Sequence, residues 1–302
     1  MSIEYNEDNL VEQATVDILA NIGWDIQTAW GNEVFGVDGS LGRENKSEVI
    51  LQKYLLAALK VLNPDLPQSA YKDAYLQISQ READKALDRT NKEKYELIKS
   101  GVKVSFTNDD GELTRKTLKV FDFNNLDNNH FLAVRQLEVT GELYNRRPDV
   151  IGFVNGIPLV FFELKAHNRD LRHAYDDNLK DYKDTIPHLF HTNAFVILSN
   201  GIDTQDNSGT KIGTITSPFK FFHEWKRISE NVEGVVSLDT TIRGTCSKSN
   251  LLDLFENFLL FDDAGGDVSK ILAKNHQYLG VNKALAQMSD ADSISELKNK
   301  LG

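Results

Sequence analysis

The sequence predicts an α/β or α+β domain with a helical annex, on three observations. Helical hydrophobic spacing dominates the first hundred residues. Alternating and continuous apolar runs, typical of strands, fill residues 102–216, and helical spacing returns after Pro218. Helices, a mixed sheet and further helices, in that order, are typical of one sheet covered by helices. The 302 residues suffice for one large domain or two ordinary ones.

The N-terminal third contains the first predicted helices. Residues 10–22 place apolar side chains at helical spacing. After the polar, glycine-rich stretch 31–46, Ser47 is the candidate N-cap of a second helix, which Pro64 ends. Residues 68–99 form one or two more helices, and the charged run within them predicts a solvated helix face.

The middle of the chain carries the predicted strands. Residues 102–106 alternate between apolar and polar, and 194–199 is a continuous apolar run, which favours a strand buried on both faces. Further strands are expected at 118–123, 130–140, 149–154, 157–164 and 211–216, with a turn at 108–111. Helices are expected at 170–184, ended by Pro187, and at 251–261 and 268–288.

Two of these strands form the clearest predicted hairpin. The dipeptide Asn155-Gly156 between two apolar runs is a strong signal for a two-residue turn. Pairing the residues that flank the turn puts Asp149 opposite Phe162, one rung from Glu163, unless a bulge shifts the register. Glu163 and Lys165 are two residues apart and therefore share a face.

Asp149, Glu163 and Lys165 are the candidate catalytic residues. Two carboxylates suit a hard cation such as Mg²⁺, with Mn²⁺ as an alternative, and such an ion polarises a phosphoryl oxygen and acidifies bound water. The lysine ammonium can stabilise developing charge or orient the attacking water. Glu163 and Lys165 end an apolar strand, where unpaired charges are costly, so a solvated surface explains them poorly. The set predicts a metal-dependent phosphodiesterase with Asp149 and Glu163 as metal ligands.

Asn178 and Tyr182 form a second candidate pair. They are four residues apart, on one face of the helix predicted after Lys165. The amide and the phenol could contact a phosphate or orient Lys165. The alternative is a helix that packs its tyrosine into the core, and spacing alone leaves both open.

Composition limits the function classes. Hydrophobic residues make up 40% and charged residues 26% of the chain, which is a globular profile. No apolar run approaches the roughly 20 residues of a spanning helix, and the acidic N-terminus does not resemble a secretory signal. The single cysteine, Cys246, allows no internal disulfide and is interpreted as a plain small residue. We therefore expect a cytoplasmic protein without a membrane partner.

The net charge of −11 weakens a nucleic-acid role without excluding it. Phosphate binding needs local cations rather than a basic whole, and a metal ion can carry the charge at the reacting phosphate.

At these residues the sequence resembles a known family. Pro148-Asp149 and Glu163-Leu164-Lys165 resemble the motif of the PD-(D/E)xK nuclease superfamily. More specifically, residues 10–286 are similar to the N-terminal part of the R (restriction) subunit of type I restriction–modification enzymes. The segments that carry this resemblance are LGRENKSEVIL (41–51), VLNPDLP (61–67), VTGELYNRRPDVIGFVNGIPLVFFELK (139–165), NLKDYKDTIPHLFHTNAFVILSNG (178–201) and KILAKNHQYLGVNKALA (270–286).

The resemblance implies a fold and an activity. The fold is a restriction-endonuclease-like core, a central mixed β-sheet flanked by helices, with a helical N-terminal insertion and a C-terminal helical segment. Residues 1–260 would be the endonuclease domain and 261–302 a helical lead-in to an absent helicase or translocase motor. Asp149 and Glu163 would hold the metal, and Lys165 would be the catalytic lysine. The implied activity is Mg²⁺-dependent, sequence-nonspecific cleavage of double-stranded DNA after ATP-driven translocation, in a complex with methyltransferase and specificity subunits.

The resemblance also marks three further positions. The family has a glutamine, three intervening residues and a tyrosine on the helix after the catalytic lysine. In this sequence Asn178 stands in the place of that glutamine and Tyr182 in the place of the tyrosine. The side chain of asparagine is one methylene shorter, so its amide has a shorter reach. Some superfamily members use a glutamate on the first helix, where Glu12 lies, but we expect a surface glutamate. Gln277 resembles an adenine-contacting glutamine. The chain contains no G-x-x-x-x-G-K-[ST] loop, so ATP is expected to bind the full-length subunit and not this chain alone.

Two other functions remain open. A catalytically weak nuclease fold could dock the motor onto the methyltransferase and specificity subunits. The Asn178 departure favours it, and the complete set of Asp149, Glu163 and Lys165 argues against it. The second open function is a repair exonuclease of the same superfamily. The family-like segments at 41–51, 61–67 and 270–286 argue against it.

Overall fold

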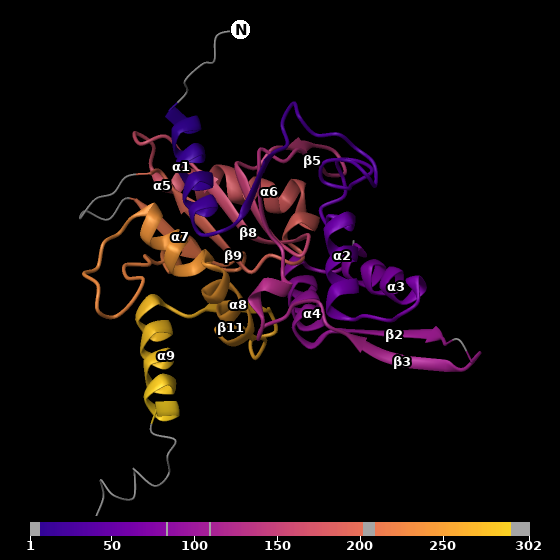
Figure 1. Ribbon diagram of the computed structural model, residues 1–302. Coiled ribbons are helices and arrows are strands. Elements are labelled where there is room, and N and C mark those ends of the chain that lie inside the picture. Colours follow the sequence, from indigo (N-terminus) through magenta and orange to yellow (C-terminus); the bar gives the residue numbers. More distant parts are fainter. Residues whose placement is uncertain (1–6, 83, 109, 202–208, 291–302) are drawn as a thin grey trace, which may run out of the picture.

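A six-stranded mixed sheet forms the centre of the protein (Figure 1). The computed structural model describes residues 7–82, 84–108, 110–201 and 209–290. The strand order is β1 (Asp25–Thr28), β4 (Phe131–Arg135), β7 (Val150–Val154), β8 (Ile157–Leu164), β9 (Phe195–Ser199) and β10 (Thr210–Gly213). The pairs β1–β4 and β8–β9 are parallel, and the other neighbours are antiparallel. The predicted α/β class with a central mixed sheet is confirmed.

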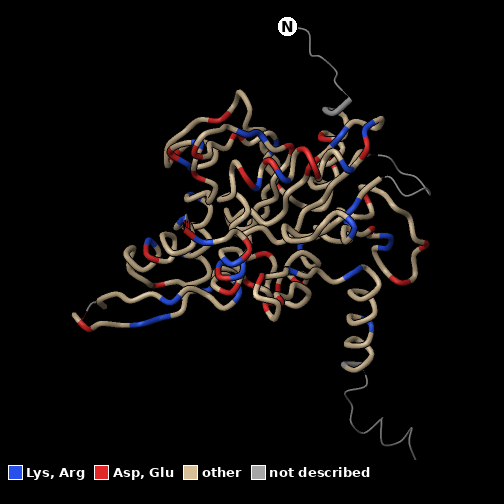
Figure 2. The backbone as a smooth tube through the Cα atoms, turned by 180° about the vertical axis from the view of Figure 1, so that it is seen from behind, with Lys and Arg blue, Asp and Glu red and all other residues tan. Residues whose placement is uncertain are grey.

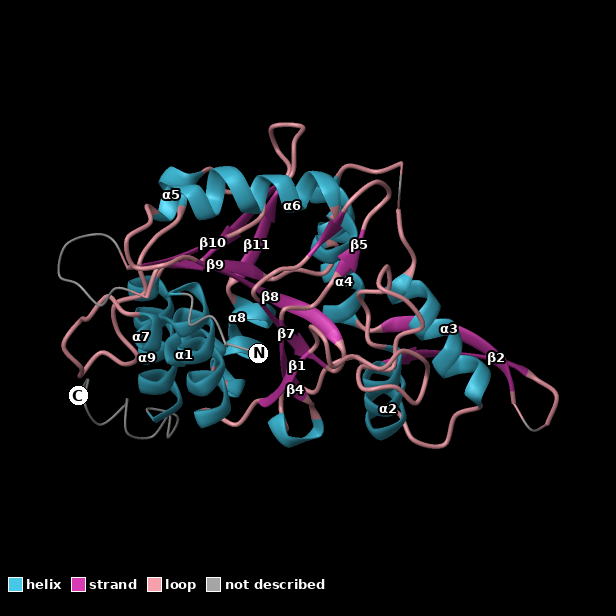
Figure 3. Ribbon diagram, turned by 90° about the horizontal axis from the view of Figure 1, so that it is seen from above, coloured by secondary structure: helices cyan, strands magenta, loops and turns pink. Residues whose placement is uncertain are grey.

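Helices cover both faces of this sheet (Figure 3). One face is packed by α1 (Glu7–Asn21), α7 (Leu238–Cys246) and α8 (Lys248–Asn257). The other is packed by α5 (Leu171–His173), the π-helical segment η2 (Ala174–Leu179) and α6 (Lys180–Thr185). Neighbouring residues of β8 serve opposite cores, with Phe162 in the first and Phe161 in the second. Burial on both faces explains why these strands are continuously apolar.

Cys246 lies at the end of α7 and is fully buried in the first of these cores, as a small packing residue would be. Over the described ranges, no helix has the length and apolar character needed to cross a membrane.

An insertion between β1 and β4 stands at one side of the sheet (Figures 1 and 3). It consists of α2 (Gln52–Leu62), α3 (Gln68–Ser79), α4 (Leu87–Ser100) and the antiparallel ribbon of β2 (Val102–Thr107) and β3 (Leu113–Leu118). Residues 68–99 therefore contain two helices, and β2 alternates between buried and exposed residues as predicted. The charged helix α4 is only partly solvated, because its Asn91 and Lys94 are buried. The predicted turn at 108–111 includes residue 109, which lies outside the described residues.

Ser47 does not cap α2, and this prediction is wrong. The helix begins at Gln52, after Leu51. The backbone N–H and the hydroxyl of Ser47 both donate to Asn45 Oδ1, at 2.9 and 2.6 Å. The Leu51 N–H donates to the Gly156 carbonyl at 2.8 Å. A local side-chain turn and a long-range bond thus keep this stretch out of the helix.

The strand predicted at 118–123 is wrong, because β3 ends at Leu118 and no strand follows up to residue 123, and the strand predicted at 130–140 is interrupted. Asn63 bonds both the N–H and the carbonyl of Lys119, so no strand partner takes these groups. The second run breaks at Gln136, whose φ of 53° is left-handed, between β4 and β5 (Val139–Thr140). β5 instead pairs with β6 (Asn145–Arg146) outside the main sheet.

A β-hairpin replaces part of the helices predicted at 251–261 and 268–288. α8 ends at Asn257, and β11 (Leu259–Asp262) pairs antiparallel with β12 (Ser269–Leu272) before α9 (Asn275–Asp290) begins. Short apolar runs fit a helix or a strand equally well, so packing decides. Leu259 and Leu272 both join the first core. The division into 1–260 and 261–302 stays a prediction, and residues 291–302 lie outside the described residues.

Candidate active site

The Asn155-Gly156 turn fixes β7 against β8. Both residues are left-handed, with φ of 50° and 77°, as the predicted two-residue turn requires. The Asn155 side chain accepts from the His130 N–H and donates to the Val120 carbonyl, each at 2.8 Å. The turn is therefore anchored to neighbouring loops as well as to its own strands.

A bulge then changes the predicted register. Pairing begins as expected at the turn but shifts between Gly152 and Phe153, so that Val150 pairs with Phe162. The predicted pairing of Asp149 with Phe162 is therefore wrong. Continuing the shifted register by one rung puts Asp149 across from Glu163, because the bulge adds one residue on the β8 side. The shift brings the two carboxylates closer than the sequence indicated.

Several strand ends meet at the edge of the sheet where these carboxylates lie. The carboxyl ends of β1, β4, β8 and β9 and the amino end of β7 share this edge. The Leu164 N–H donates to Asp149 Oδ2 at 2.7 Å, and the Gln136 N–H donates to the Asp149 carbonyl at 2.8 Å. The Lys165 N–H donates to the Ser199 carbonyl at 2.8 Å. Backbone bonds to three strands thus hold Asp149 and Lys165 in place.

Glu163 is the most unusual carboxylate at this edge. It is 1% exposed, and its Oε1 accepts a hydrogen bond from Lys165 Nζ at 2.8 Å. Its Oε2 is buried without a partner among the described residues. Burial raises the pKa of Glu163 well above its usual value, the negative charge of Asp149 raises it further, and Lys165 opposes both. The site is therefore short of positive charge.

A divalent cation between Asp149 and Glu163 would supply the missing positive charge. Asp149 and Glu163 supply carboxylate oxygens, the ligands that hard cations prefer. Over the described part of the chain, no three His, Cys, Asp or Glu side chains gather as a ready-made cage. Two protein carboxylates are nevertheless a set that Mg²⁺ accepts, because it keeps several waters and takes substrate phosphate oxygens as further ligands.

Glu12 also faces this edge, and the expectation of a surface glutamate is wrong. It is 4% exposed, and its Oε2 accepts from Arg135 Nε at 2.7 Å and from Gln136 Nε2 at 3.0 Å. Its charge contributes to the raised pKa of Glu163. Helical spacing could not show this, because the partners of Glu12 come from the end of β4.

Asn178 and Tyr182 lie beside the carboxylates. Tyr182 is 8% exposed and packs edge-to-face on Phe161, with ring centroids 5.7 Å apart. Burial raises the pKa of Tyr182, Glu163 and Asp149 raise it further, and a hydrogen bond from Asn178 opposes them. The interpretation that the helix packs its tyrosine into the core is therefore confirmed. Contact of the pair with a phosphate or with Lys165 stays a prediction.

The helix that carries this pair contains a π-helical turn, which the spacing did not predict. In η2 the Lys180 N–H bonds to the Tyr175 carbonyl, five residues earlier. Such turns occur frequently at functional sites, because they rotate the following residues relative to a regular helix.

The structure thus brings five of the six predicted site residues together: Asp149, Glu163, Lys165, Asn178 and Tyr182. Gln277 lies apart, on α9, where its Oε1 accepts from the Lys274 N–H at 2.8 Å (Figure 1). Its contact with adenine stays a prediction. The sequence reasoning missed Arg135 and Gln136, although an apolar strand ending in a charged residue, the signal used for Lys165, also marks Arg135.

Comparison with known proteins decides the family. The sequence model described as "Type I restriction enzyme R protein N terminus" matches residues 4–210. The chain belongs to this family. It is 33% identical over 288 residues to the type I restriction enzyme HindI endonuclease subunit of Haemophilus influenzae, covering 92% of this chain and 26% of that protein. It is 27% identical over 195 residues to the type I restriction enzyme EcoprrI endonuclease subunit of Escherichia coli, covering 64% of this chain and 59% of that protein.

The chain spans about a quarter of the length of three relatives that match more than 90% of its residues. The resemblance that the sequence suggested to this family is confirmed.

Proposed function

We propose that the chain is the endonuclease region of a type I restriction enzyme R subunit, with a PD-(D/E)xK centre that hydrolyses double-stranded DNA. The observation that carries this proposal is the buried Glu163 carboxylate, which has one oxygen on Lys165 and the other without a partner among the described residues. Two carboxylates and a lysine at one sheet edge are a set that phosphodiester hydrolysis can use.

Each residue has a defined part in this proposal. Asp149 and Glu163 would hold Mg²⁺, or Mn²⁺ in its place, and the bound ion supplies polarisation of the phosphoryl oxygen and acidification of water. Lys165 Nζ, now on Glu163, directs its remaining N–H groups to the attacking water or to a phosphate oxygen and stabilises the negative charge that develops there. Water adds to phosphorus, and the bond from phosphorus to the leaving sugar oxygen breaks.

Asn178 and Tyr182 support these groups. The Tyr182 hydroxyl is close enough to the carboxylates for their charges to raise its pKa, so it stays protonated as a hydrogen-bond donor. Asn178 fixes that hydroxyl through its own hydrogen bond. The pair would position a DNA phosphate or a water rather than transfer a proton.

The activity of the longer subunit is part of the same proposal. By family, the subunit would draw DNA through an ATP-driven motor in a cytoplasmic complex with methyltransferase and specificity subunits, and the present region would cut without reading sequence. Gln277 would then lie beside the adenine of the ATP bound by the full-length subunit.

The docking function is the alternative, and Glu163 argues against it. The buried charge of Glu163, whose pKa is raised, lowers the stability of the fold, so a domain that serves only assembly would be more stable without it. A metal-binding centre requires the same charge.

Plasmid cleavage tests the proposal. We expect Asp149→Asn and Lys165→Gln each to lower the Mg²⁺-dependent cleavage rate by about a hundredfold or more. Asp177→Asn, which removes an exposed carboxylate from η2, is the matched control and should cut at the wild-type rate. In the assembled complex, Lys165→Ala should lose cleavage while ATP-driven translocation continues. Retained cleavage in that complex would support the docking function instead.

A further inference from the structure

Arg147 is a cation at the catalytic edge, and no acidic side chain of the described residues forms an ion pair with it. Two of the other arginines in this region are paired with carboxylates. Arg135 pairs with Glu12 at 2.7 Å, and Arg146 makes a bidentate pair with Asp181 at 2.5 and 2.8 Å. Arg147 is exposed, and among the described residues no carboxylate lies within ion-pair distance of it. Acidic and basic residues are mixed along the backbone of this acidic chain (Figure 2).

The guanidinium of Arg147 is held by an aromatic ring instead. Its central carbon lies 4.1 Å from the centroid of the Trp30 ring. Trp30 follows β1 at the same sheet edge and is 51% exposed, although a tryptophan without a binding role is usually mostly buried. Stacking leaves the N–H groups at the rim of a guanidinium available, in the planar arrangement that matches two phosphate oxygens.

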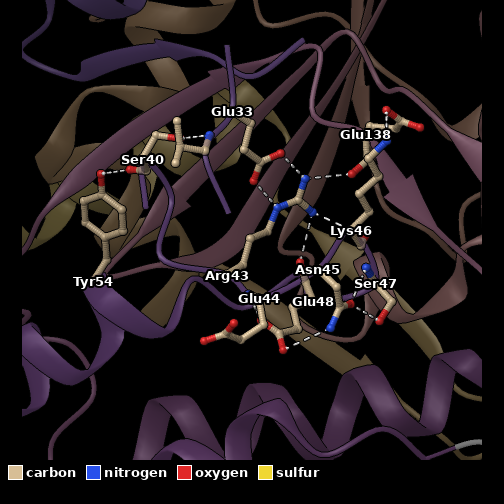
Figure 4. A network of polar contacts seen from close by, with 11 residues as sticks. Glu33, Ser40, Arg43, Glu44, Asn45, Lys46, Ser47, Glu48, Tyr54 and Glu138 are labelled. Atoms are coloured by element: carbon tan, nitrogen blue, oxygen red, sulfur yellow. Dashed lines mark hydrogen bonds and ion pairs between the residues drawn. The ribbon is translucent and has the colours of Figure 1, made fainter. Parts of the chain in front are cut away.

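A buried network holds the loop from which Trp30 projects. Arg43 is fully buried, and Figure 4 shows its guanidinium directed at Glu33. Arg43 donates to both Glu33 oxygens, at 2.5 and 2.6 Å, and to the carbonyls of Lys46, Glu48 and Glu138, at 3.3, 3.1 and 2.8 Å. These bonds use every N–H that an arginine side chain has. The Glu33 N–H also donates to the Ala29 carbonyl at 2.9 Å, so the backbone turn that carries Trp30 is tied to this network.

We propose that Arg147, stacked on Trp30, binds a DNA backbone phosphate beside the one that is cut. Arg147 is two residues from Asp149, and two residues span at most about 7 Å of extended chain. Successive phosphates of one strand are about 3.4 Å apart along the helix axis. Arg147 is therefore close enough to the proposed metal ligands to contact a phosphate near the reacting group. This inference rests on the proposed DNA nuclease function and names a substrate contact that the carboxylates cannot make.

Binding of a fluorescent 30-base-pair duplex to this chain in EDTA, measured by anisotropy from 50 to 200 mM salt, tests the proposal. We expect Arg147→Gln to weaken binding about tenfold and to reduce the slope of log K against log salt by about 0.9, the value for one lost phosphate contact. Arg147→Lys should keep the slope but weaken binding a few-fold, because an ammonium cannot stack in the same way. Trp30→Leu should fall between wild type and Arg147→Gln.

A matched control separates this contact from a general charge effect. Arg89→Gln removes the same charge from an exposed position on α4, next to the β11–β12 hairpin, and should change affinity less than about twofold. Melting temperatures of all variants confirm that they fold. Wild-type affinity and slope in Arg147→Gln, an equal loss in Arg89→Gln, or no binding by the wild-type chain would overturn the proposal.

A cleavage assay of Asp149→Asn distinguishes failure of the proposed nuclease function from failure of the proposed Arg147 phosphate contact. If Asp149→Asn still cuts, the proposed nuclease centre is wrong. If Asp149→Asn binds DNA without cutting it, and Arg147→Gln binds like wild type, only the phosphate contact is wrong.

Discussion

The backbone N–H of Leu164 donates a hydrogen bond to the carboxylate of Asp149, with 2.7 Å between nitrogen and Oδ2. This bond ties the start of β7 to the end of β8 and leaves the neighbouring Glu163 facing a second negative charge. Like charges in close proximity raise each other's pKa unless a cation lies between them.

Metal binding should depend on Asp149. We expect calorimetric titration of Mg²⁺ or Mn²⁺ into the wild-type chain to show binding, and Asp149→Ala to weaken it by about tenfold or more, since one of two protein ligands is lost. Asp177→Ala, which removes an exposed carboxylate, should bind like wild type. Unchanged binding in Asp149→Ala would remove Asp149 from the ligand set.

Glu163→Gln should stabilise the metal-free chain at neutral pH. The pKa of Glu163 is raised on folding, so ionisation lowers stability as the pH rises from the unfolded value of 4.5 through the raised folded value. Glutamine cannot ionise, so its advantage in melting temperature should grow over that window and vanish below pH 4.5. Added Mg²⁺ should raise the melting temperature of wild type only. An advantage that is independent of pH would contradict the buried charge as its cause.

Gly156→Ala should destabilise the fold by about 3 kcal/mol, because it combines left-handed strain with a steric clash. A Cβ at Gly156 would lie 2.6 Å from the Leu51 carbonyl oxygen. Gly111→Ala is the matched control, since Gly111 has a φ of 83° but open space around its Cβ position. It should lose only about 1 kcal/mol. Equal losses in urea unfolding would show that the contact with Leu51 is unimportant.

One buried histidine, His188, and one half-buried histidine, His191, should make the chain sensitive to mild acid. Burial lowers the pKa of His188 to about 3, with Arg81 and His191 adding to the effect, and burial lowers the pKa of His191 to about 4. Both pKa values are depressed on folding, so stability is fully present above the usual value of 6.5 and falls as the pH drops toward the folded values.

Urea unfolding between pH 7 and pH 4.5 measures this loss. Each histidine contributes a slope of at most about 1.4 kcal/mol per pH unit. We expect His191→Gln to reduce the slope relative to that of the wild-type chain. Identical slopes in wild type and His191→Gln would contradict the assignment.

The sequence by itself determined the elements whose signals are local. The Asn155-Gly156 turn and the apolar runs of β7, β8 and β9 have few structural alternatives, because turn conformation and two-sided burial each demand particular residue types. An apolar strand that ends in charged residues marked Glu163 and Lys165. The family resemblance then joined these pieces into one expected fold.

Only the tertiary structure decided the rest. The bulge that puts Asp149 across from Glu163, the burial of Glu12 on Arg135 and Gln136, and the hairpin at Leu259–Leu272 all depend on partners distant in sequence. Amphipathic spacing states which residues can be buried, but not which strand or loop will meet them. The stacking of Arg147 on Trp30 could not be predicted for the same reason, since 116 residues lie between them in the chain and none of them indicates the contact.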